Sequence, residues 1–183
     1  VADCAKAHHV PIRVGVNSGS VEKELLAKYG RPSPEAMAES ALNHVRMLEK
    51  AGFYDTVISV KASNVRDTIE VNRLLTQKCD YPLHIGVTEA GLPGRGTIKS
   101  AIALGALLCD GIGDTMRVSL SGDPAAEPAA ALEILRALGL RRGVDVISCP
   151  TCGRTCIDVA GIAKKVEEAT KDWTCSLRVA VMG

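Results

Sequence analysis

The chain has 183 residues, of which 46% are hydrophobic, 3% are aromatic and 23% are charged, and its formal net charge is +1. This length suits one medium domain or a domain and a half, with a core of Ala, Val, Leu and Ile. A net charge near zero argues against a surface for nucleic acid or anionic membranes, so any affinity for anions must be local. We expect neither a membrane-spanning segment, because no apolar stretch is long enough, nor a signal peptide.

Four short runs of β-branched and apolar residues predict parallel strands that are covered on both faces. They span residues 10–17, 56–62, 82–89 and 115–120. The segments between them have helical periodicity. Such an alternation of strands and helices is typical of βα units in a parallel sheet or barrel.

The helices between these strands have recognisable start and stop signals. Ser33 can cap a helix that has Pro34 at its first position and that ends at Gly52. A second helix follows Asn64. A third, over residues 98–109, is apolar on nearly all sides, and we expect it to be buried.

The pattern changes after residue 124, where a helix rich in Ala and Leu begins a second segment. Its predicted elements are a helix over 129–138, a strand over 144–147, an amphipathic helix over 157–169 and a last strand over 176–181. We therefore divide the chain into residues 1–124 and 125–183, with the boundary between 124 and 143.

Charged and polar residues gather at the ends of the first four predicted strands. Because side chains alternate along a strand, Arg13 shares a face with Asn17, and Arg117 shares a face with Ser119. Lys61 closes the second strand. In a parallel barrel the ligand lies at the carboxyl ends of the strands, and guanidinium groups bind phosphate oxygens bidentately. These residues predict a site for a polyanion such as a diphosphate.

A simpler reading is that each of these charges extends from its strand end into water. An Arg on the inner face of a barrel is costly without an anionic partner, which favours the binding site for the set as a whole. Glu89, which closes the third strand, is either a structural ion-pair partner or an acid/base group, and we favour the active-site role. His84 is expected to be packed or hydrogen-bonded rather than catalytic.

A Cys-x-x-Cys motif follows the apolar run over residues 144–147, with Cys149 and Cys152 separated by a Pro-containing turn. Two thiols at this spacing are compatible with zinc, an iron–sulfur cluster or a redox disulfide. The chain has seven cysteines, an odd number scattered through an α/β pattern. This usage favours a reducing compartment and predicts a cytoplasmic protein.

Taken together, the motifs resemble the 4-hydroxy-3-methylbut-2-enyl diphosphate synthase family. The segments that carry the resemblance occur in the same order: IRVGVNSGS at 12–20, VKAS at 60–63, TEAG at 88–91, KSAI at 99–102, GIGDTMRVSL at 111–120 and CPTCGR at 149–154. They cover nearly the whole chain and are jointly far more specific than a single Cys-x-x-Cys.

The resemblance implies the second half of a TIM-type (β/α)8 barrel followed by the start of a small α/β iron–sulfur domain. It implies reductive ring opening and dehydration of 2-C-methyl-D-erythritol 2,4-cyclodiphosphate, with electrons from a flavodoxin or ferredoxin, in a homodimer. By the same resemblance, the diphosphate is bound by Arg13, Asn17, Lys61, Arg117 and Ser119, the acidic group is Glu89, and two ligands of a 4Fe–4S cluster are Cys149 and Cys152.

The chain departs from the family pattern at both ends. The resemblance implies that the first four βα units, a third cluster cysteine and a ligating glutamate are missing. Cys156 and Cys175 do not occupy the positions of those ligands. We therefore expect a fragment that is inactive alone.

Two other hypotheses stay open at the level of sequence. In the first, the second segment is a zinc-binding structural module in which Cys149 and Cys152 are joined by Cys156 or Cys175. In the second, the chain belongs to a redox-inert barrel enzyme of the pterin-binding type, and the Cys-x-x-Cys is incidental.

Overall fold

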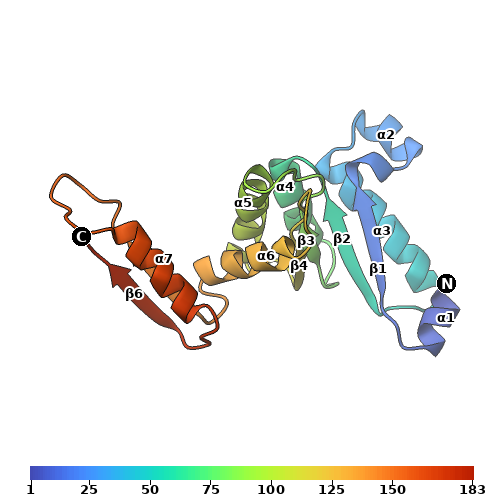
Figure 1. The fold of residues 1–183 in the computed structure, drawn as a ribbon. Coiled ribbons are helices and arrows are strands. Elements are labelled where there is room, and N and C mark those ends of the chain that lie inside the picture. The colour runs from blue at the N-terminus through green and yellow to red at the C-terminus, as the bar shows by residue number, and fades with distance from the viewer. The chain divides into compact units, whose positions relative to one another are not determined.

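The structure is a computed structural model that describes residues 1–183, and it divides into two compact units, Val1–Ala131 and Leu132–Gly183 (Figure 1). Each unit is described by itself. None of the helices combines the length and the apolar content that crossing a lipid bilayer would require. All seven cysteines are free thiols.

The first unit alternates helices with parallel strands, as the sequence predicts. Its elements are α1 (Ala2–Ala7), β1 (Ile12–Asn17), a 3-10 turn (Ser18–Ser20), α2 (Lys23–Tyr29), α3 (Pro34–Lys50), β2 (Thr56–Lys61), α4 (Val65–Thr76), β3 (His84–Gly86), α5 (Arg95–Cys109) and β4 (Thr115–Arg117). Helix α6 (Ala126–Ala137) runs across the boundary between the two units.

The strands of the first unit follow one another in chain order. β1 pairs with β2 in parallel, from Ile12 opposite Thr56 onwards, and β3 pairs with β4. A parallel bridge between Ile58 and Leu83 connects β2 to the start of β3. All pairings are therefore parallel, and each successive strand is reached through a helix, which is the βα arrangement expected from the sequence.

Strands β3 and β4 are shorter than predicted, with three residues each. After Gly86 the chain leaves the β3–β4 ladder, and Glu89 adopts a left-handed backbone conformation with φ of 53°. Val87 and Ala90 are nevertheless buried, in a cluster with Ala103. The apolar run that predicted a long strand therefore belongs partly to a packed loop, because apolar content alone does not separate a strand from a buried turn.

The core of the first unit lies between the strands and helices α3, α4 and α5. The largest fully buried side chains in this unit are Val16, Met37, Ile58, Val60, Val71, Leu75, Ile85, Val87, Leu104, Leu107 and Val118. The predicted helix starts are confirmed, since the Ser33 hydroxyl accepts a hydrogen bond from the Ala36 N–H at 3.3 Å and the Asn64 side-chain oxygen Oδ1 accepts one from the Arg66 N–H at 2.8 Å. These caps fix where α3 and α4 begin and hence which faces they bury.

The prediction that the helix over residues 98–109 is buried all round is wrong. In α5, Leu104 and Leu107 are fully buried, but Ile98 and Ile102 are 62% and 55% exposed. The helix packs against α4 and β3, which cover one side only. An apolar sequence thus leaves one apolar face uncovered within this chain.

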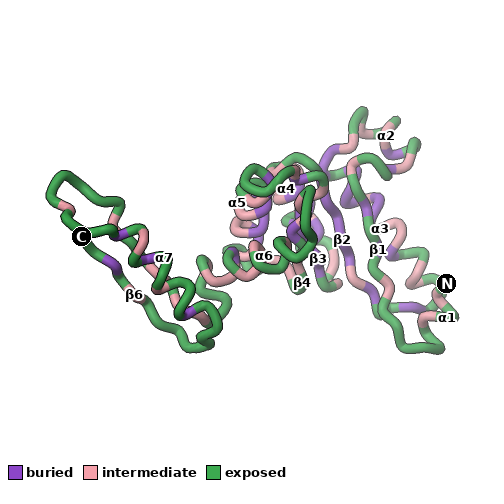
Figure 2. Tube along the Cα trace, viewed as in Figure 1, coloured by how far each residue is buried: buried purple, intermediate pink, exposed green.

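The second unit is a small βαβ arrangement. It contains β5 (Val144–Ser148), α7 (Val159–Thr170) and β6 (Leu177–Val181), and β5 pairs in parallel with β6. Asp158 caps α7 by accepting a hydrogen bond from the Gly161 N–H at 2.9 Å. The buried cluster consists of Val159, Ala163 and Val181, and most of this unit is exposed (Figure 2).

Truncating a core residue of α5 should destabilise the first unit. We expect Leu104→Ala to lower the free energy of unfolding of the chain by about 2–5 kcal/mol, since it leaves a cavity where the side chain is fully buried. Urea denaturation followed by circular dichroism measures this. Ile102→Ala on the same helix is the matched control and should change the free energy of unfolding by about 0.5 kcal/mol or less. Equal losses in the two variants would place both faces of α5 in contact with other elements.

Candidate functional site

The parallel register arranges the candidate residues of the first unit in rows across the strands. Asn17 lies opposite Lys61 on β1 and β2, and Gly86 lies opposite Arg117 on β3 and β4. Because Ile58 pairs with Leu83, Lys61 is level with Gly86 three residues further on. One row at the carboxyl ends of the strands therefore contains Asn17, Lys61, Gly86 and Arg117. The row beneath it, on the same face, contains Gly15, Ser59, His84 and Thr115.

Arg13 does not lie at a strand end, contrary to the expectation from the sequence. It is the second residue of β1 and pairs with Val57, four residues before the carboxyl end. The expected alternation is confirmed, because Arg13, Gly15 and Asn17 are exposed while Val14 and Val16 are buried. The charge of Arg13 nevertheless contributes to the lowered pKa of Lys61, after desolvation and the charge of Arg117.

Lys61 is a buried cation beside other cations. It is 7% exposed, and desolvation, followed by the charges of Arg117 and Arg13, lowers its pKa from 10.5 to about 8. None of the six ion pairs of the chain includes any of these three residues. A buried ammonium group without a carboxylate partner is unfavourable, and a bound anion would relieve that cost.

His84 is part of the same cluster, although the sequence analysis did not place it there. Its Nδ1 lies 2.8 Å from the Thr115 hydroxyl, so the expected hydrogen bond is confirmed. Desolvation, followed by the charges of Lys61, Arg13 and Arg117, lowers its pKa from 6.5 to about 4. The imidazole is therefore neutral near pH 7. Its position two residues before Gly86, and hence on the same face as the strand-end row, is the signal that could have identified it.

The remaining polar candidates of the first unit lie beside these cations. Arg117 donates a hydrogen bond from Nε to the Ser119 hydroxyl at 2.8 Å. The backbone of Asn17 is fixed by a tight turn in which its N–H donates to the Ser20 hydroxyl at 2.9 Å. This turn holds the Asn17 backbone in place at the strand end.

Glu89 is an exposed residue with a left-handed backbone conformation, three residues after β3. A non-glycine residue with φ of 53° is uncommon and is frequent at functional sites. Glu89 takes part in none of the chain's ion pairs. Glu89 therefore lies just after β3 in the chain, and its carboxylate forms no ion pair with the basic residues of the strands.

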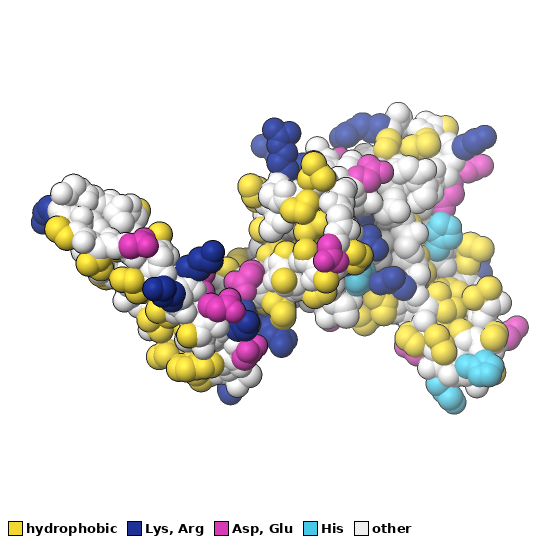
Figure 3. Space-filling view, viewed as in Figure 1, with side chains coloured by type: hydrophobic (Ala, Val, Ile, Leu, Met, Phe, Trp, Pro, Cys, Tyr) yellow, Lys and Arg dark blue, Asp and Glu magenta, His cyan; other side chains and the backbone are white.

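The space-filling view shows Lys, Arg and His atoms side by side over β2 to β4, in the middle of the first unit (Figure 3). The cluster that we call the basic site consists of Arg13, Lys61, His84 and Arg117. Three of its members are donors only, which suits anionic oxygens such as those of a phosphate or a carboxylate.

In the second unit the two motif cysteines lie in the loop between β5 and α7. Cys149 is half-buried and packs against the cluster of Val159, Ala163 and Val181, and its N–H donates to the Val181 carbonyl at 3.0 Å. Cys152 is exposed, and hydrogen bonding from the Arg154 backbone N–H lowers the pKa of its thiol. A thiolate stabilised by a backbone N–H is the form in which cysteine binds metal, so this loop is suited to supply cluster ligands.

These thiols do not form a complete metal site within the chain. No group of three or more His, Cys, Asp or Glu side chains is arranged to hold a metal ion. A closed zinc site needs four such ligands.

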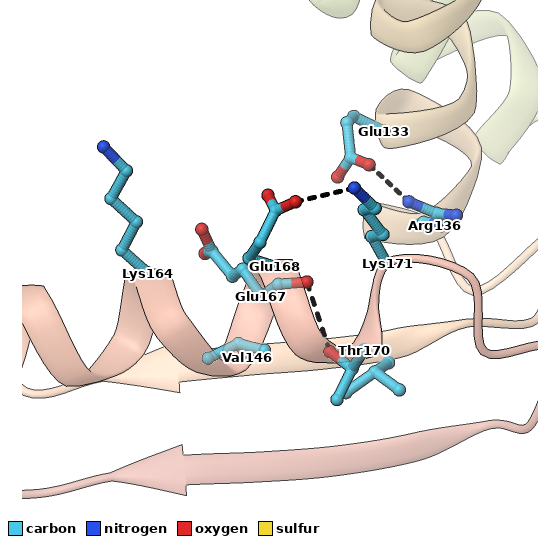
Figure 4. A pocket seen from close by; sticks show the side chains of 9 residues that line it. Glu133, Arg136, Val146, Lys164, Glu167, Glu168, Thr170 and Lys171 are labelled. Carbon is cyan, nitrogen blue, oxygen red and sulfur yellow. Dashed lines mark hydrogen bonds and ion pairs between the residues drawn. The ribbon is translucent and has the colours of Figure 1, made fainter.

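A groove of ≈ 440 Å³ in the second unit contains none of the candidate residues (Figure 4). Its lining contains acidic and basic residues in equal number: Glu133, Glu167 and Glu168 are acidic, and Arg136, Lys164 and Lys171 are basic. Two ion pairs, Glu133 with Arg136 and Glu168 with Lys171, each at 2.6 Å, neutralise much of this charge. The groove therefore lacks the excess of cations that distinguishes the basic site.

The chain thus combines a parallel βα unit that carries a basic site with a small βαβ unit whose loop carries two cysteines. Comparison with known families makes this specific. The family described as GcpE TIM-barrel domain matches residues 1–132, and that described as GcpE protein C-terminal domain matches residues 145–183. The chain belongs to the GcpE family.

Curated relatives agree with this assignment. The chain is 57% identical to a protein of Clostridium perfringens, 60% identical to one of Caldanaerobacter subterraneus and 57% identical to one of Geobacter sulfurreducens. Each of these is named 4-hydroxy-3-methylbut-2-en-1-yl diphosphate synthase (flavodoxin). The matches cover 100% of this chain but only 53%, 52% and 52% of the relatives, so the chain spans about half of their length.

Gly86 packs closely against Arg117 and Lys61, and this contact provides a test of the strand register. A Cβ at this position would lie 2.6 Å from the Arg117 carbonyl oxygen and 3.4 Å from Lys61 Cε. We expect Gly86→Ala to lower the free energy of unfolding by about 1–3 kcal/mol, because the methyl group forces β3 away from β4. Gly15→Ala is the control, since a Cβ there meets nothing within 4 Å on the same face. Thermal denaturation that ranks the two variants equally would contradict the register of β3 with β4.

Proposed function

We propose that this chain forms part of a 4-hydroxy-3-methylbut-2-en-1-yl diphosphate synthase. The substrate is 2-C-methyl-D-erythritol 2,4-cyclodiphosphate, which takes up two electrons, opens its ring and loses water. The single observation that carries the proposal is the basic site, in which a buried lysine lies beside two arginines without any carboxylate partner. Membership of the GcpE family and the names of the relatives support the particular reaction.

In this proposal the first unit is the second half of a (β/α)8 barrel and binds the diphosphate. Arg13, Lys61 and Arg117 supply the positive charge, and the arginines can bind phosphate oxygens bidentately. Asn17 and Ser119 add neutral hydrogen bonds at the carboxyl ends of the strands. The strained backbone of Glu89 orients its carboxylate next to the bound ligand, where it exchanges a proton with a hydroxyl group of the substrate.

The second unit is proposed to be part of a 4Fe–4S domain, with Cys149 and Cys152 as two of the ligands. Such a cluster, when bound, supplies electrons one at a time to the ring-opening step. We assign the remaining ligand positions to a cysteine and a glutamate outside these 183 residues, as the family resemblance implies. Flavodoxin is the proposed electron donor, following the names of the relatives, and the intact enzyme is proposed to be a homodimer in the cytoplasm.

The functions of the two units should be separable by mutation. A suitable protein is a chimera in which these 183 residues replace the matching segment of the Clostridium perfringens relative. We expect Cys149→Ser or Cys152→Ser to abolish turnover while leaving the affinity for the cyclodiphosphate within about tenfold, because the cysteines would hold the cluster and not the substrate. Affinity is measured by calorimetry, and turnover with a reduced electron donor.

Cys109→Ser is the matched control, since this exposed thiol at the end of α5 has no proposed role and its loss should leave both quantities unchanged. Retention of turnover by the Cys149 and Cys152 variants would contradict the proposed cluster ligands. Full loss of cyclodiphosphate affinity in a folded variant would contradict the separation of roles.

The depressed pKa of Lys61 predicts how binding varies with pH. In the free protein Lys61 loses its proton near pH 8, and a bound anion raises that pKa again. The affinity for the cyclodiphosphate in the chimera should therefore fall as the pH rises above about 8, by up to about tenfold per pH unit. Each phosphorus atom of the ligand carries only one ionisable, strongly acidic oxygen, so the ligand keeps its charge over this range.

Calorimetric titration at pH 7, 8 and 9 measures this slope. Lys61→Arg is the control, because arginine stays protonated and its variant should bind with an affinity that does not change across the series. His84, with its pKa of about 4, is neutral at all three values and does not contribute. The same slope in both proteins would show that Lys61 does not contact the anion.

A further inference from the structure

The segment that follows β4 contains part of the proposed anion site. Arg117 is the last residue of β4, and its Nε donates a hydrogen bond to the Ser119 hydroxyl at 2.8 Å. Pairing of β4 with β3 ends at Arg117, so it does not fix the residues beyond. Other contacts must therefore hold Ser119 in the position from which it orients the guanidinium group.

One such contact comes from helix α6. The Leu120 N–H donates a hydrogen bond to Oε1 of Glu127 at 2.9 Å, and Glu127 is the second residue of α6. This bond is partly buried, and Glu127 belongs to none of the six ion pairs of the chain. A hydrogen bond between a backbone N–H and a carboxylate is stronger than one between neutral groups. Glu127 therefore anchors the residue next to Ser119.

The anchored segment also contacts the loop that follows Glu89. The Ser121 N–H donates a hydrogen bond to the Gly91 carbonyl at 3.0 Å. A Cβ at Gly96, near the start of α5, would lie 2.8 Å from Leu120 Cδ2 and 2.8 Å from the Gly91 carbonyl oxygen. The loop, the start of α5 and the segment after β4 are thus closely packed. A shift of Leu120 would displace this loop as well as the end of β4.

The charge of Glu127 is opposite to that of the basic site. A carboxylate repels anions, so Glu127 is not suited to bind the diphosphate directly. We propose that Glu127 is a positioning residue of the basic site, which acts by holding Leu120 in place. The Ser119 hydroxyl then keeps the Arg117 guanidinium in one orientation for a phosphate oxygen. The inference rests on the proposed function and adds to it a residue that the ligand does not touch.

Two substitutions separate the charge of Glu127 from its hydrogen bond. Glu127→Asp keeps the carboxylate but shortens the side chain by one methylene group, so the bond to Leu120 is lost. Glu127→Gln removes the charge but keeps an oxygen in the same place, so the bond is retained. Asp is favourable in the first turn of a helix and Gln is a good helix former, so α6 should form in both variants.

Two further variants complete the set. Glu127→Ala loses both the charge and the acceptor, and it should therefore behave like Glu127→Asp. Glu133→Ala, later on the same helix, is the matched control, because the ion pair of Glu133 with Arg136 lies within the helix. Urea denaturation checks that every variant is folded.

The affinity for the cyclodiphosphate is measured by calorimetry on the chimera. We expect Glu127→Asp and Glu127→Ala to weaken binding by about tenfold, whereas Glu127→Gln and Glu133→Ala should stay within about threefold of the unsubstituted chimera. Hydrogen–deuterium exchange at the Leu120 amide reports the hydrogen bond itself. It should become faster in the Asp and Ala variants and stay unchanged in the Gln variant.

An electrostatic role of Glu127 would produce a different ranking, with unchanged affinity in Glu127→Asp and tighter binding in Glu127→Gln and Glu127→Ala. That ranking would overturn the inference, and so would faster exchange at Leu120 without a loss of affinity. Equal losses in the Asp and Gln variants would also overturn it, because the hydrogen bond would not be the cause. Failure of the unsubstituted chimera to bind the cyclodiphosphate would instead contradict the proposed function itself.

Discussion

The arrangement of the first unit depends on one unfavourable interaction, the burial of the Lys61 ammonium group beside Arg13 and Arg117. Removal from water and repulsion by like charges both act against the protonated lysine, and no carboxylate offsets them. Folding must therefore supply the free energy that holds these charges together before any ligand binds. The hydrophobic core behind the strands offsets the repulsion between the cations, so the anion that we propose as ligand would meet a site that is already formed.

The parallel strands connect the hydrophobic core to the basic site. Each strand presents alternate residues to the basic site and to the helices, so the same backbone that buries Val14 and Val16 holds Arg13 and Asn17 on the opposite face. Gly86 allows the β3 backbone to lie close to Arg117 and Lys61, because no side chain intervenes. The positions of the cations are therefore set by strand pairing rather than by loops.

The sequence predicted those parts of the structure that follow from local rules. The period of two along a strand placed Arg13 with Asn17, and the cap signals at Ser33 and Asn64 located the starts of α3 and α4. Features that depend on contacts between distant segments were not predictable in the same way. The exposure of Ile98 and Ile102 depends on which elements cover α5, and the apolar run after Gly86 became a packed loop.

The same distinction between local rules and distant contacts applies to the candidate site. Strand alternation correctly placed Arg13 on one face with Asn17, but Arg13 was also expected near a strand end, which the register does not support. His84 was assigned a hydrogen bond correctly, yet its membership of the basic site depends on β2 and β4, which are remote from it in sequence. For Cys149 and Cys152, the spacing predicted a pair of metal ligands or a redox disulfide, and their role stays a prediction, since no third possible ligand lies with them.

The small core of the second unit has a consequence for how long such a protein survives in a cell. Only Val159, Ala163 and Val181 form the buried cluster, and the loop with Cys149 and Cys152 packs directly against it. A unit of this size has little hydrophobic stabilisation of its own, so a group that cross-links the loop would add a large share of its resistance to unfolding. If that group is the proposed iron–sulfur cluster, protein without it would be cleaved by proteases more often, and its abundance would follow the supply of iron and sulfide.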